Sequence, residues 1–321
     1  MNIAALVGLT VLIFTRPLQC CLQSSKKSHS AKRSVPLPQL PLEKYRNEYK
    51  KSLQKWGQPT PSMTYRIPRS NCTLCGRRGV DGNFHSIIHG QAAPEKFYPW
   101  QVFIRGRKNF CGGALIGPRW VLTAAHCINA TVYVLLGTTN IVNYSSTAVV
   151  RRADREIIHH EFNGVHHDIA LIRLALPVSY NNYIRPICIP RKIIDFSKSS
   201  ECYVTGWGLK QQDSKTAKLL QEVKVRLMRH SECFTRWMIA RTLINYGQMC
   251  TDLDRADPDA GACYGDSGGP LSCRVGDSFY VAGIASLVQS KCRKTILPDL
   301  YVKVSYYRTW IRLTILADGD A

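Results

Sequence analysis

The spacing of apolar and polar residues changes twice along this chain of 321 residues. Residues 3–14 form one short apolar run, and residues 20–70 follow with little sustained pattern. From Ile87 onward, short apolar runs typical of β-strands alternate with turns rich in Gly, Pro and Asn. Examples of these runs are residues 102–104, 120–123, 131–136 and 280–285. The pattern predicts an all-β sandwich or barrel after Ile87.

Only the end of the chain has the spacing of a helix. Over residues 306–316, the side chains of Tyr307, Trp310, Ile311 and Thr314 fall on adjoining faces. We therefore predict one helix at this end of the chain and strands in the rest of the region after Ile87.

The first apolar run is too short to cross a bilayer, which takes about 20 helical residues. It is followed by Arg16, Pro17 and a pair of cysteines at 20 and 21. This order favours a secretory signal peptide over residues 1–20, and the alternative is a buried helix at the chain start. No later segment has the length and apolar character of a membrane anchor.

Residues 21–86 are rich in Lys, Arg, Ser and Pro, and we interpret them as a pro-segment. Within it, residues 42–56 place apolar side chains at helical spacing, with lysines and arginines between them. These apolar residues are Leu42, Tyr45, Tyr49, Leu53 and Trp56. The stretch is either a basic amphipathic helix that needs a partner to hold it or a flexible linker.

The formal net charge of the chain is +21, and its distribution is uneven. Residues 1–86 carry 14 basic and 3 acidic side chains, so about half of the excess lies in about a quarter of the chain. A basic segment of this kind suits an acidic glycan or a membrane surface, and the alternative is a solvated surface with no dedicated partner. Nucleic-acid binding has no supporting motif and is not expected.

The chain has 13 cysteines and three acceptor patterns for N-glycosylation, at Asn71, Asn129 and Asn143. So many cysteines are unusual in a reducing compartment. Together with the signal-like start, they predict a secreted, extracellular protein with disulfide bonds.

Three motifs carry the chemistry of the chain. They are Thr-Ala-Ala-His-Cys at 123–127, Asp-Ile-Ala-Leu-Ile at 168–172 and Gly-Asp-Ser-Gly-Gly-Pro at 265–270. In this order they resemble the chymotrypsin/trypsin family of serine peptidases, as do Pro-Trp-Gln-Val at 99–102 and Gly-Trp-Gly at 206–208. The resemblance covers residues 87–321 and implies a peptidase domain of two antiparallel β-barrels with a C-terminal helix.

The resemblance assigns a catalytic triad to His126, Asp168 and Ser267. A serine hydroxyl is a weak nucleophile, so it needs an imidazole to accept its proton and a carboxylate to hold that imidazole. The backbone N–H groups of Gly265 and Ser267 would form the oxyanion hole. The implied function is secreted endoproteolysis through an acyl-enzyme intermediate, without a cofactor, with polypeptide substrates and protein protease inhibitors as partners.

The resemblance also implies how ten of the cysteines pair. The expected disulfides are Cys111–Cys127, Cys202–Cys273, Cys233–Cys250, Cys263–Cys292 and Cys75–Cys188. The last of these would link the pro-segment to the peptidase domain. Cys72 is left without a mate, and Cys72 and Cys75 could exchange roles. A zinc site at this pair lacks two further ligands nearby.

In this family, cleavage frees an α-amino group that pairs with the aspartate before the nucleophile. Ile-Ile-His-Gly at 87–90 and Asp266 match these parts, but Ser86 stands where the family has a basic residue. A cut at Arg77-Arg78 would leave the wrong new terminus. Activation therefore needs another kind of enzyme, and the alternative function is a catalytically silent binding protein locked in the zymogen form.

The expected specificity pocket departs from that of the trypsins. Gly261 stands where trypsins have an aspartate and is followed by Ala262. Alignment of the wall strand, with Ser286, places Val288 at a position that is glycine in trypsins and narrows the entrance. Asp299 on the opposite wall could receive a basic side chain, which we favour over small-residue specificity. Alternatively, Asp299 is solvated or pairs with Arg293 or Lys294.

Metal sites are not expected from the sequence. Residues 137–150, where some relatives hold calcium, contain no acidic side chain. The histidine pairs at 159–160 and 166–167 could attract zinc, but we interpret them as incidental because a metal site needs several convergent ligands.

Overall fold

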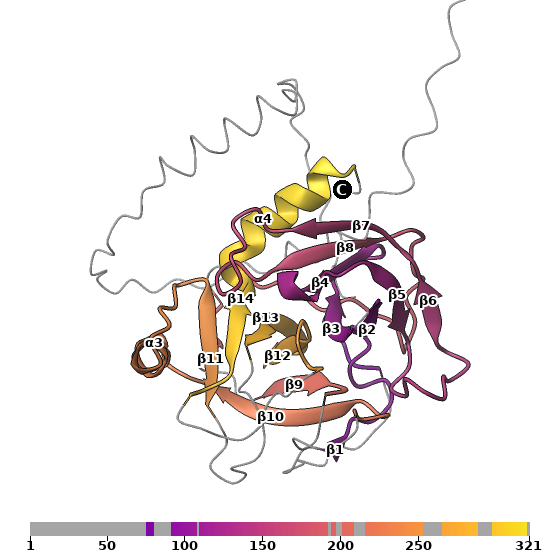
Figure 1. The fold of residues 1–321 in the computed structure, drawn as a ribbon. Helices are drawn as coiled ribbons and strands as arrows, with labels where there is room; N and C mark the ends of the chain where they lie inside the picture. The colour runs from indigo at the N-terminus through magenta and orange to yellow at the C-terminus, as the bar shows by residue number, and fades with distance from the viewer. Residues whose placement is uncertain are drawn as a thin grey trace, which may run out of the picture. The chain divides into compact units, whose positions relative to one another are not determined.

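Two antiparallel sheets of seven strands each make up the fold (Figure 1). The computed structural model describes residues 75–79, 91–107, 109–191, 194–196, 201–208, 216–252, 265–287 and 297–319. Each sheet curls into a barrel, so the predicted all-β fold of two barrels with a C-terminal helix is confirmed.

The first barrel has the strand order β6-β5-β2-β3-β4-β8-β7. Its strands are β2 (Gln101–Gly106), β3 (Phe110–Leu115), β4 (Trp120–Thr123), β5 (Thr131–Leu136), β6 (Val149–Arg151), β7 (Ala153–Ile158) and β8 (Ala170–Leu174). Strands β4 and β8 are antiparallel neighbours, and Thr123 at the end of β4 pairs with Ala170 at the start of β8. The loops that follow β4 and precede β8 therefore leave the barrel at the same place.

The second barrel has the order β1-β10-β11-β14-β13-β12-β9, and β9 also pairs with β10. Its strands are β1 (Gln91–Ala92), β9 (Cys202–Gly206), β10 (Gln221–Leu227), β11 (Gln248–Asp252), β12 (Pro270–Val275), β13 (Ser278–Leu287) and β14 (Leu300–Lys303). The β9–β10 pairing closes the sheet on itself, so this barrel has a continuous ring of hydrogen bonds.

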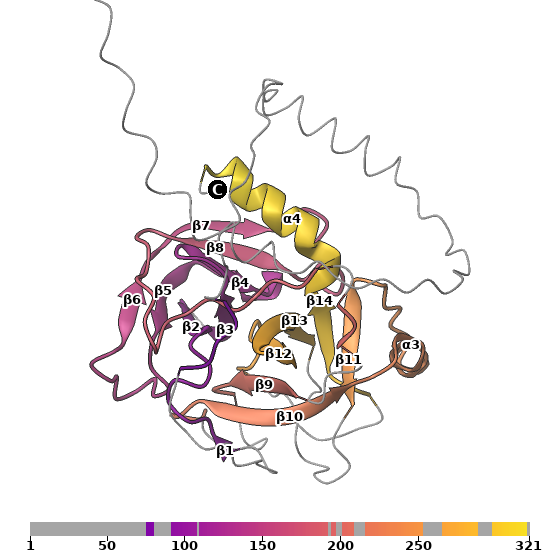
Figure 2. The same ribbon diagram turned by 180° about the vertical axis from the view of Figure 1, so that it is seen from behind.

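The helix at the end of the described chain, α4 (Val304–Ala317), begins two residues before the predicted start. It leaves β14 of the second barrel and lies beside β7 and β8 of the first (Figures 1 and 2). Its buried side chains include Tyr307, Ile311 and Ile315, which join the main hydrophobic core. At the end of the helix, Asp318 forms an ion pair with Arg173 of β8, with 2.7 Å between Oδ2 and Nε.

A second helix, α3 (His230–Ile239), contradicts the prediction that only the end of the chain is helical. Only Cys233 and Trp237 of this helix are buried, so its apolar periodicity is weak. The disulfide Cys233–Cys250 fixes it to β11 instead. A helix held by one covalent bond and one aromatic side chain gives little signal in the spacing of its residues.

Four disulfides lie in the described part of the chain, and they are pairs that the family resemblance implied: Cys75–Cys188, Cys111–Cys127, Cys202–Cys273 and Cys233–Cys250. Cys263 and Cys292 lie outside the described residues, as do Cys72, the signal-like run and the amphipathic stretch at 42–56. Among the described helices, none has the length and hydropathy required to span a bilayer.

Residues 75–79 are bound to the second barrel by more than their disulfide. The backbone N–H of Gly76 donates a hydrogen bond to the carbonyl of Pro186 at 2.9 Å. The carbonyl of Gly76 accepts a hydrogen bond from the backbone N–H of Phe279 at 2.8 Å. Arg78 inserts its guanidinium between four aromatic rings, with its central carbon 4.4–5.1 Å from their centroids. The rings belong to Phe97, Tyr98, Tyr203 and Phe279.

A buried polar chain continues from this cation. Arg78 Nη2 donates to the Tyr98 hydroxyl at 3.2 Å, and Tyr98 donates to Glu222 Oε2 at 2.5 Å. Burial raises the pKa of Glu222, whereas the Tyr98 hydrogen bond and the charge of Arg78 lower it. The guanidinium therefore compensates a carboxylate that the barrel wall has taken out of water.

We expect the substitution Arg78→Ala to destabilise the protein by about 2 kcal/mol, because a desolvated cation–π contact and the charge that faces Glu222 are both lost. Urea unfolding measures this difference. Arg77→Ala is the matched control, since it removes the same charge one residue away, and it should change stability by less than about 0.5 kcal/mol. Equal effects of the two variants would contradict the anchoring role of Arg78.

Candidate active site

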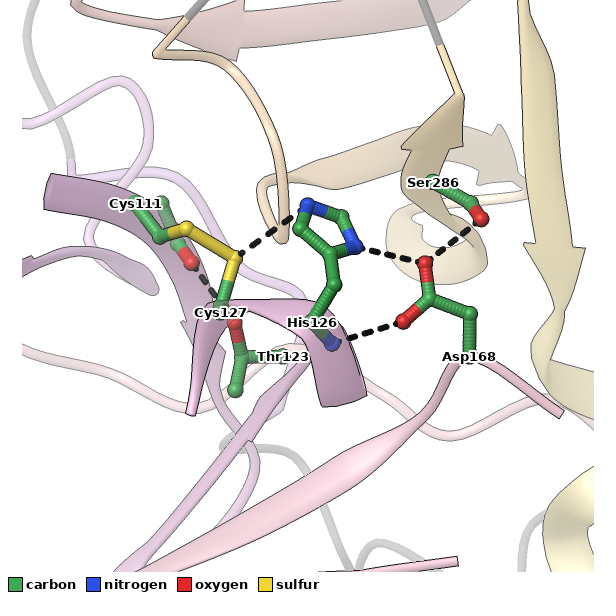
Figure 3. The surroundings of a disulfide bond; sticks show 7 residues. Cys111, Thr123, His126, Cys127, Asp168 and Ser286 are labelled. Carbon is green, nitrogen blue, oxygen red and sulfur yellow. Dashed lines mark hydrogen bonds and ion pairs between the residues drawn. A yellow bond between two sulfur atoms is a disulfide. The ribbon is translucent and has the colours of Figure 1, made fainter. Parts of the chain in front are cut away.

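His126 lies in a short 3-10 turn, η1 (Ala125–Cys127), directly after β4. Asp168 lies two residues before β8. Because the ends of these strands are paired, the two side chains meet: His126 Nδ1 is 2.7 Å from Asp168 Oδ2. The backbone N–H of His126 also donates to Asp168 Oδ1 at 2.9 Å. One carboxylate thus fixes both the ring and the main chain of the histidine (Figure 3).

The two partners differ in their access to solvent. The side chain of Asp168 is 1% exposed, whereas that of His126 is 34% exposed. A buried carboxylate needs hydrogen-bond donors to replace water. Asp168 has three of them, so it remains a strong acceptor for the imidazole N–H while the other edge of the ring stays accessible.

The third donor is Ser286, which comes from β13 of the second barrel. Its hydroxyl donates to Asp168 Oδ2 at 2.6 Å (Figure 3). The family resemblance places Ser286 in the wall of the specificity pocket and does not predict this contact. No local signal could have found it, because Ser286 and Asp168 are 118 residues apart.

A disulfide borders the other side of the imidazole. Cys127 Sγ, bonded to Cys111 of β3, is 3.8 Å from His126 Nε2 (Figure 3). Thr123 Oγ1 donates to the carbonyl of Gly112 at 2.9 Å and adds a second link between β3 and β4. The histidine turn is therefore fixed to β3 as well as to Asp168.

The loop that carries Ser267 lies against this same part of β3. The carbonyl of Ser267 accepts the backbone N–H of Gly112 at 2.8 Å, and Gly268 donates to the carbonyl of Ala285 at 2.8 Å. Gly268 has a φ of +76°, and a Cβ there would lie 2.2 Å from Thr123 Oγ1. Only glycine fits at this position, where the loop turns next to the histidine segment.

The segment before Ser267 has a second left-handed glycine, Gly265, with a φ of +100°. A Cβ at Gly265 would lie 2.7 Å from the ring of Phe110. Between the two glycines, the carboxylate of Asp266 faces the segment that follows β9, where Oδ1 accepts the backbone N–H of Gly208 at 2.9 Å. Its expected activation partner, Ile87, lies outside the described residues, as does Ser86.

The structure describes two of the five expected pocket residues. Ser286 and Asp299 are both buried, at 4% and 7% exposed, whereas Gly261, Ala262 and Val288 lie outside the described residues. Burial is the main cause that raises the pKa of the Tyr301 hydroxyl, and the negative charge of Asp299 adds to it. The Asp299 carboxylate therefore acts electrostatically on a buried group of the second barrel.

Of the expected glycosylation positions, Asn129 and Asn143 are exposed and Asn71 is outside the described part.

Two groups of side chains in the described residues have the composition of metal ligands. Cys111, His126 and Cys127 form one, but both cysteines are disulfide-bonded and offer no thiolate. His159, Glu161 and His167 form the other, in the loop that leads to Asp168.

Comparison with known proteins gives concordant matches. The family model described as Trypsin matches residues 87–311. Ovochymase of Halocynthia roretzi is 32% identical over 243 residues, which cover 71% of this chain and 15% of that protein. Transmembrane protease serine 9 of Rattus norvegicus is 32% identical over 272 residues, which cover 82% of this chain and 25% of that protein.

The chain thus spans a quarter or less of the length of these two relatives. The family match, in contrast, extends over most of the chain and includes both barrels and all three motifs. The chain belongs to the trypsin family of serine proteases.

Proposed function

We propose that this chain is a secreted serine endopeptidase that hydrolyses polypeptides with His126, Asp168 and Ser267. The observation that carries the proposal is the buried carboxylate of Asp168, which accepts hydrogen bonds from both the ring and the backbone of His126. With Nδ1–H donated to Asp168, the Nε2 lone pair is available as a base. Such a restraint suits a histidine that must present one fixed tautomer for proton transfer.

In the proposed reaction, His126 takes the hydroxyl proton of Ser267 as the oxygen attacks the scissile carbonyl carbon. The carbonyl oxygen becomes an oxyanion that the N–H groups of Gly265 and Ser267 stabilise. The C–N bond then breaks, and His126 returns its proton to the leaving amine. Water hydrolyses the acyl-enzyme by the same steps, with His126 again as base.

The oxyanion hole requires the loop of residues 265–269 to keep its conformation. Left-handed backbone at Gly265 and Gly268, together with the 2.8 Å bond from Gly112 to Ser267, supports this assignment. The backbone N–H of Gly208 donates to Asp266 and so holds this residue, which lies between the two glycines in sequence. Contacts of this kind would help to keep the N–H groups in place for substrate once cleavage has freed Ile87.

The proposal extends to the parts of the chain that precede the barrels. We assign a signal peptide to residues 1–20, a pro-segment to 21–86 and the peptidase domain to 87–321. Activation would occur at Ser86–Ile87, and the new amino group would pair with Asp266. The disulfide Cys75–Cys188 would then retain the pro-segment, whose basic residues suit an acidic glycan or a membrane surface.

For specificity, we favour a basic residue before the cut. Asp299 is buried and directly precedes β14 of the second barrel. Ser286, the other described residue of the expected pocket, lies on β13 of the same barrel. A carboxylate within a pocket wall selects a cationic side chain because it compensates the charge that substrate binding removes from water. Small apolar residues are the alternative, through a narrowing at Val288.

A serine-directed fluorophosphonate probe tests the enzymatic proposal. The secreted protein is incubated with the probe before and after cleavage at an engineered Ser86→Arg site. We expect labelling at Ser267 after cleavage, because a freed Ile87 would pair with Asp266 and order the oxyanion hole. Mass spectrometry of the labelled peptide identifies the modified residue.

Ser267→Ala is the matched control in this experiment, because it removes only the hydroxyl and should abolish labelling. Cleaved Ser86→Arg protein that is correctly folded but takes up no probe would reject the peptidase. That result would favour the alternative, a protease fold that acts only as a binding protein. Amino-terminal sequencing of the natural secreted protein then reports whether Ile87 is ever freed.

A further inference from the structure

The loop between β7 and β8 contains four histidines, at positions 159, 160, 166 and 167. The structure separates them into two sets. The ligand atoms of His159, Glu161 and His167 all lie within 4.8 Å of one another. We name these three residues the histidine–glutamate group. His166 points elsewhere, with Nδ1 3.1 Å from Gln248 Oε1. Potential ligand atoms therefore lie close together in these three residues, and His166 is not one of them.

The separations in the histidine–glutamate group suit one small cation. His167 Nδ1 is 3.7 Å from Glu161 Oε2. Two ligands that each bind a tetrahedral zinc ion at about 2.1 Å are about 3.4 Å apart, so a small adjustment brings this pair to coordination distance. His159 is 6% exposed, whereas Glu161 and His167 are half-buried, so the group has a closed side and an open side.

Burial disfavours the protonated form of both histidines in the group. Burial, with smaller effects of His160 and His167, lowers the pKa of His159 to about 4. Burial also lowers the pKa of His167, and the charge of Glu161 only partly opposes this. Both shifts favour the neutral imidazole, which is the form that binds metals.

Helix α4 contacts the group through two side chains. The hydroxyl of Tyr307 is 3.1 Å from His167 Nδ1, the nitrogen that faces Glu161, so metal binding at Nδ1 would replace this hydrogen bond. The ring of Trp310 lies 5.1 Å from that of His159. His167 also has a left-handed backbone, with a φ of +56°, directly before Asp168. Such a conformation costs free energy in a residue other than glycine and is enriched at functional sites.

We propose that His159, Glu161 and His167 form a binding site for a divalent transition-metal ion, with Zn²⁺ as the best chemical match. Two imidazoles and one carboxylate are a zinc-type donor set that leaves a fourth position for water or an incoming ligand. The two imidazole rings are nearly parallel, at 15°, so one of them rotates for both lone pairs to reach the ion. The proposal differs from the expectation from the sequence alone, in which the histidine pairs at 159–160 and 166–167 are incidental.

Isothermal titration with ZnSO₄ in a non-chelating buffer tests the site on the full, disulfide-intact chain after treatment with a chelator. We expect one equivalent of Zn²⁺ to bind, and the substitutions Glu161→Gln and His167→Gln to weaken this binding at least about tenfold. Trp310 provides a second signal, because rotation of His159 beside its ring changes its fluorescence. Trp310→Phe should remove that signal and keep the binding.

His160→Gln is the matched control, because this exposed histidine is adjacent in sequence but outside the histidine–glutamate group. It should leave the affinity unchanged, as should His126→Ala, which tests whether zinc binds at the triad instead. His159→Gln removes a buried side chain, so the decisive variant is Glu161→Gln at a half-buried position. Absence of binding, or binding equally weakened by His160→Gln, would overturn the proposal. The titration needs no substrate, so it stands apart from the test of the peptidase.

Discussion

Replacement of Asp168 by asparagine is expected to slow the reaction at Ser267 by about 10⁴-fold, the magnitude known for this change in the chymotrypsin-type triad. The hydrogen bonds explain why so small a change has so large an effect. Oδ1 of Asp168 accepts the backbone N–H of His126, and Oδ2 accepts both His126 Nδ1–H and the Ser286 hydroxyl. Both oxygens are therefore acceptors, and an amide has only one.

Each orientation of the amide creates a conflict. With its NH₂ group toward the backbone N–H of His126, two donors face each other. With the NH₂ toward the imidazole, the ring can relieve the conflict by moving its proton from Nδ1 to Nε2. We expect the second orientation to prevail, and a ring protonated at Nε2 cannot accept the proton of Ser267. The rate constant for fluorophosphonate labelling, measured on Ser86→Arg protein after cleavage, reports this loss.

Ser286→Ala is the control for this first prediction, because it removes one donor but leaves both carboxylate oxygens and the imidazole tautomer unchanged. We expect its labelling rate to fall by about tenfold at most, since one net hydrogen bond contributes about 1 kcal/mol. If Asp168→Asn were no slower than Ser286→Ala, Asp168 would not set the tautomer of His126.

The second large effect is expected at Asp299. With peptides that carry Arg before the cut, Asp299→Asn should lower kcat/KM by about thirtyfold or more, because loss of one partner of a desolvated charge pair costs at least about 2 kcal/mol. With peptides that carry Ala there, kcat/KM should change little. The ratio of the two kcat/KM values, measured on the activated enzyme, isolates recognition from general damage to the barrel.

Asp277→Asn is a suitable comparison, since Asp277 is an exposed acid of the same barrel, in the turn between β12 and β13. Asp277→Asn should leave kcat/KM unchanged for both the Arg and the Ala peptides. If Asp299→Asn lowered kcat/KM equally for Arg and Ala peptides, Asp299 would have a structural role, such as the pairing with Arg293 or Lys294 considered from the sequence. A wild-type preference for Ala peptides would favour small-residue specificity.

Sequence reasoning went furthest where a residue's task is encoded in its neighbours. The motifs around His126 and Asp168 lie on loops that the β4–β8 register brings together, and the apolar run at 120–123 predicted β4. The motif at 265–270 includes Gly268, and the structure gives the reason for glycine at this position, since a Cβ there would lie 2.2 Å from Thr123 Oγ1.

Contacts across the two barrels could not be predicted in the same way. Ser286 meets Asp168 only because β13 of one barrel faces the β8 loop of the other. Similarly, Arg78 was considered only as half of a dibasic cleavage site, whereas its guanidinium lies among four aromatic rings from separate segments. Helix α3 was missed because a disulfide, and not an apolar face, holds it.

The Cys75–Cys188 bond has a consequence for where the proposed enzyme would work. A cut at Ser86–Ile87 would produce a two-chain molecule, and the pro-segment of residues 21–86 would stay with the barrels for as long as that bond remained oxidised. Any surface that retains the basic segment would then also confine proteolysis to its vicinity. A reducing environment would not release the barrels at once, because Arg78 and the backbone bonds of Gly76 would delay the separation.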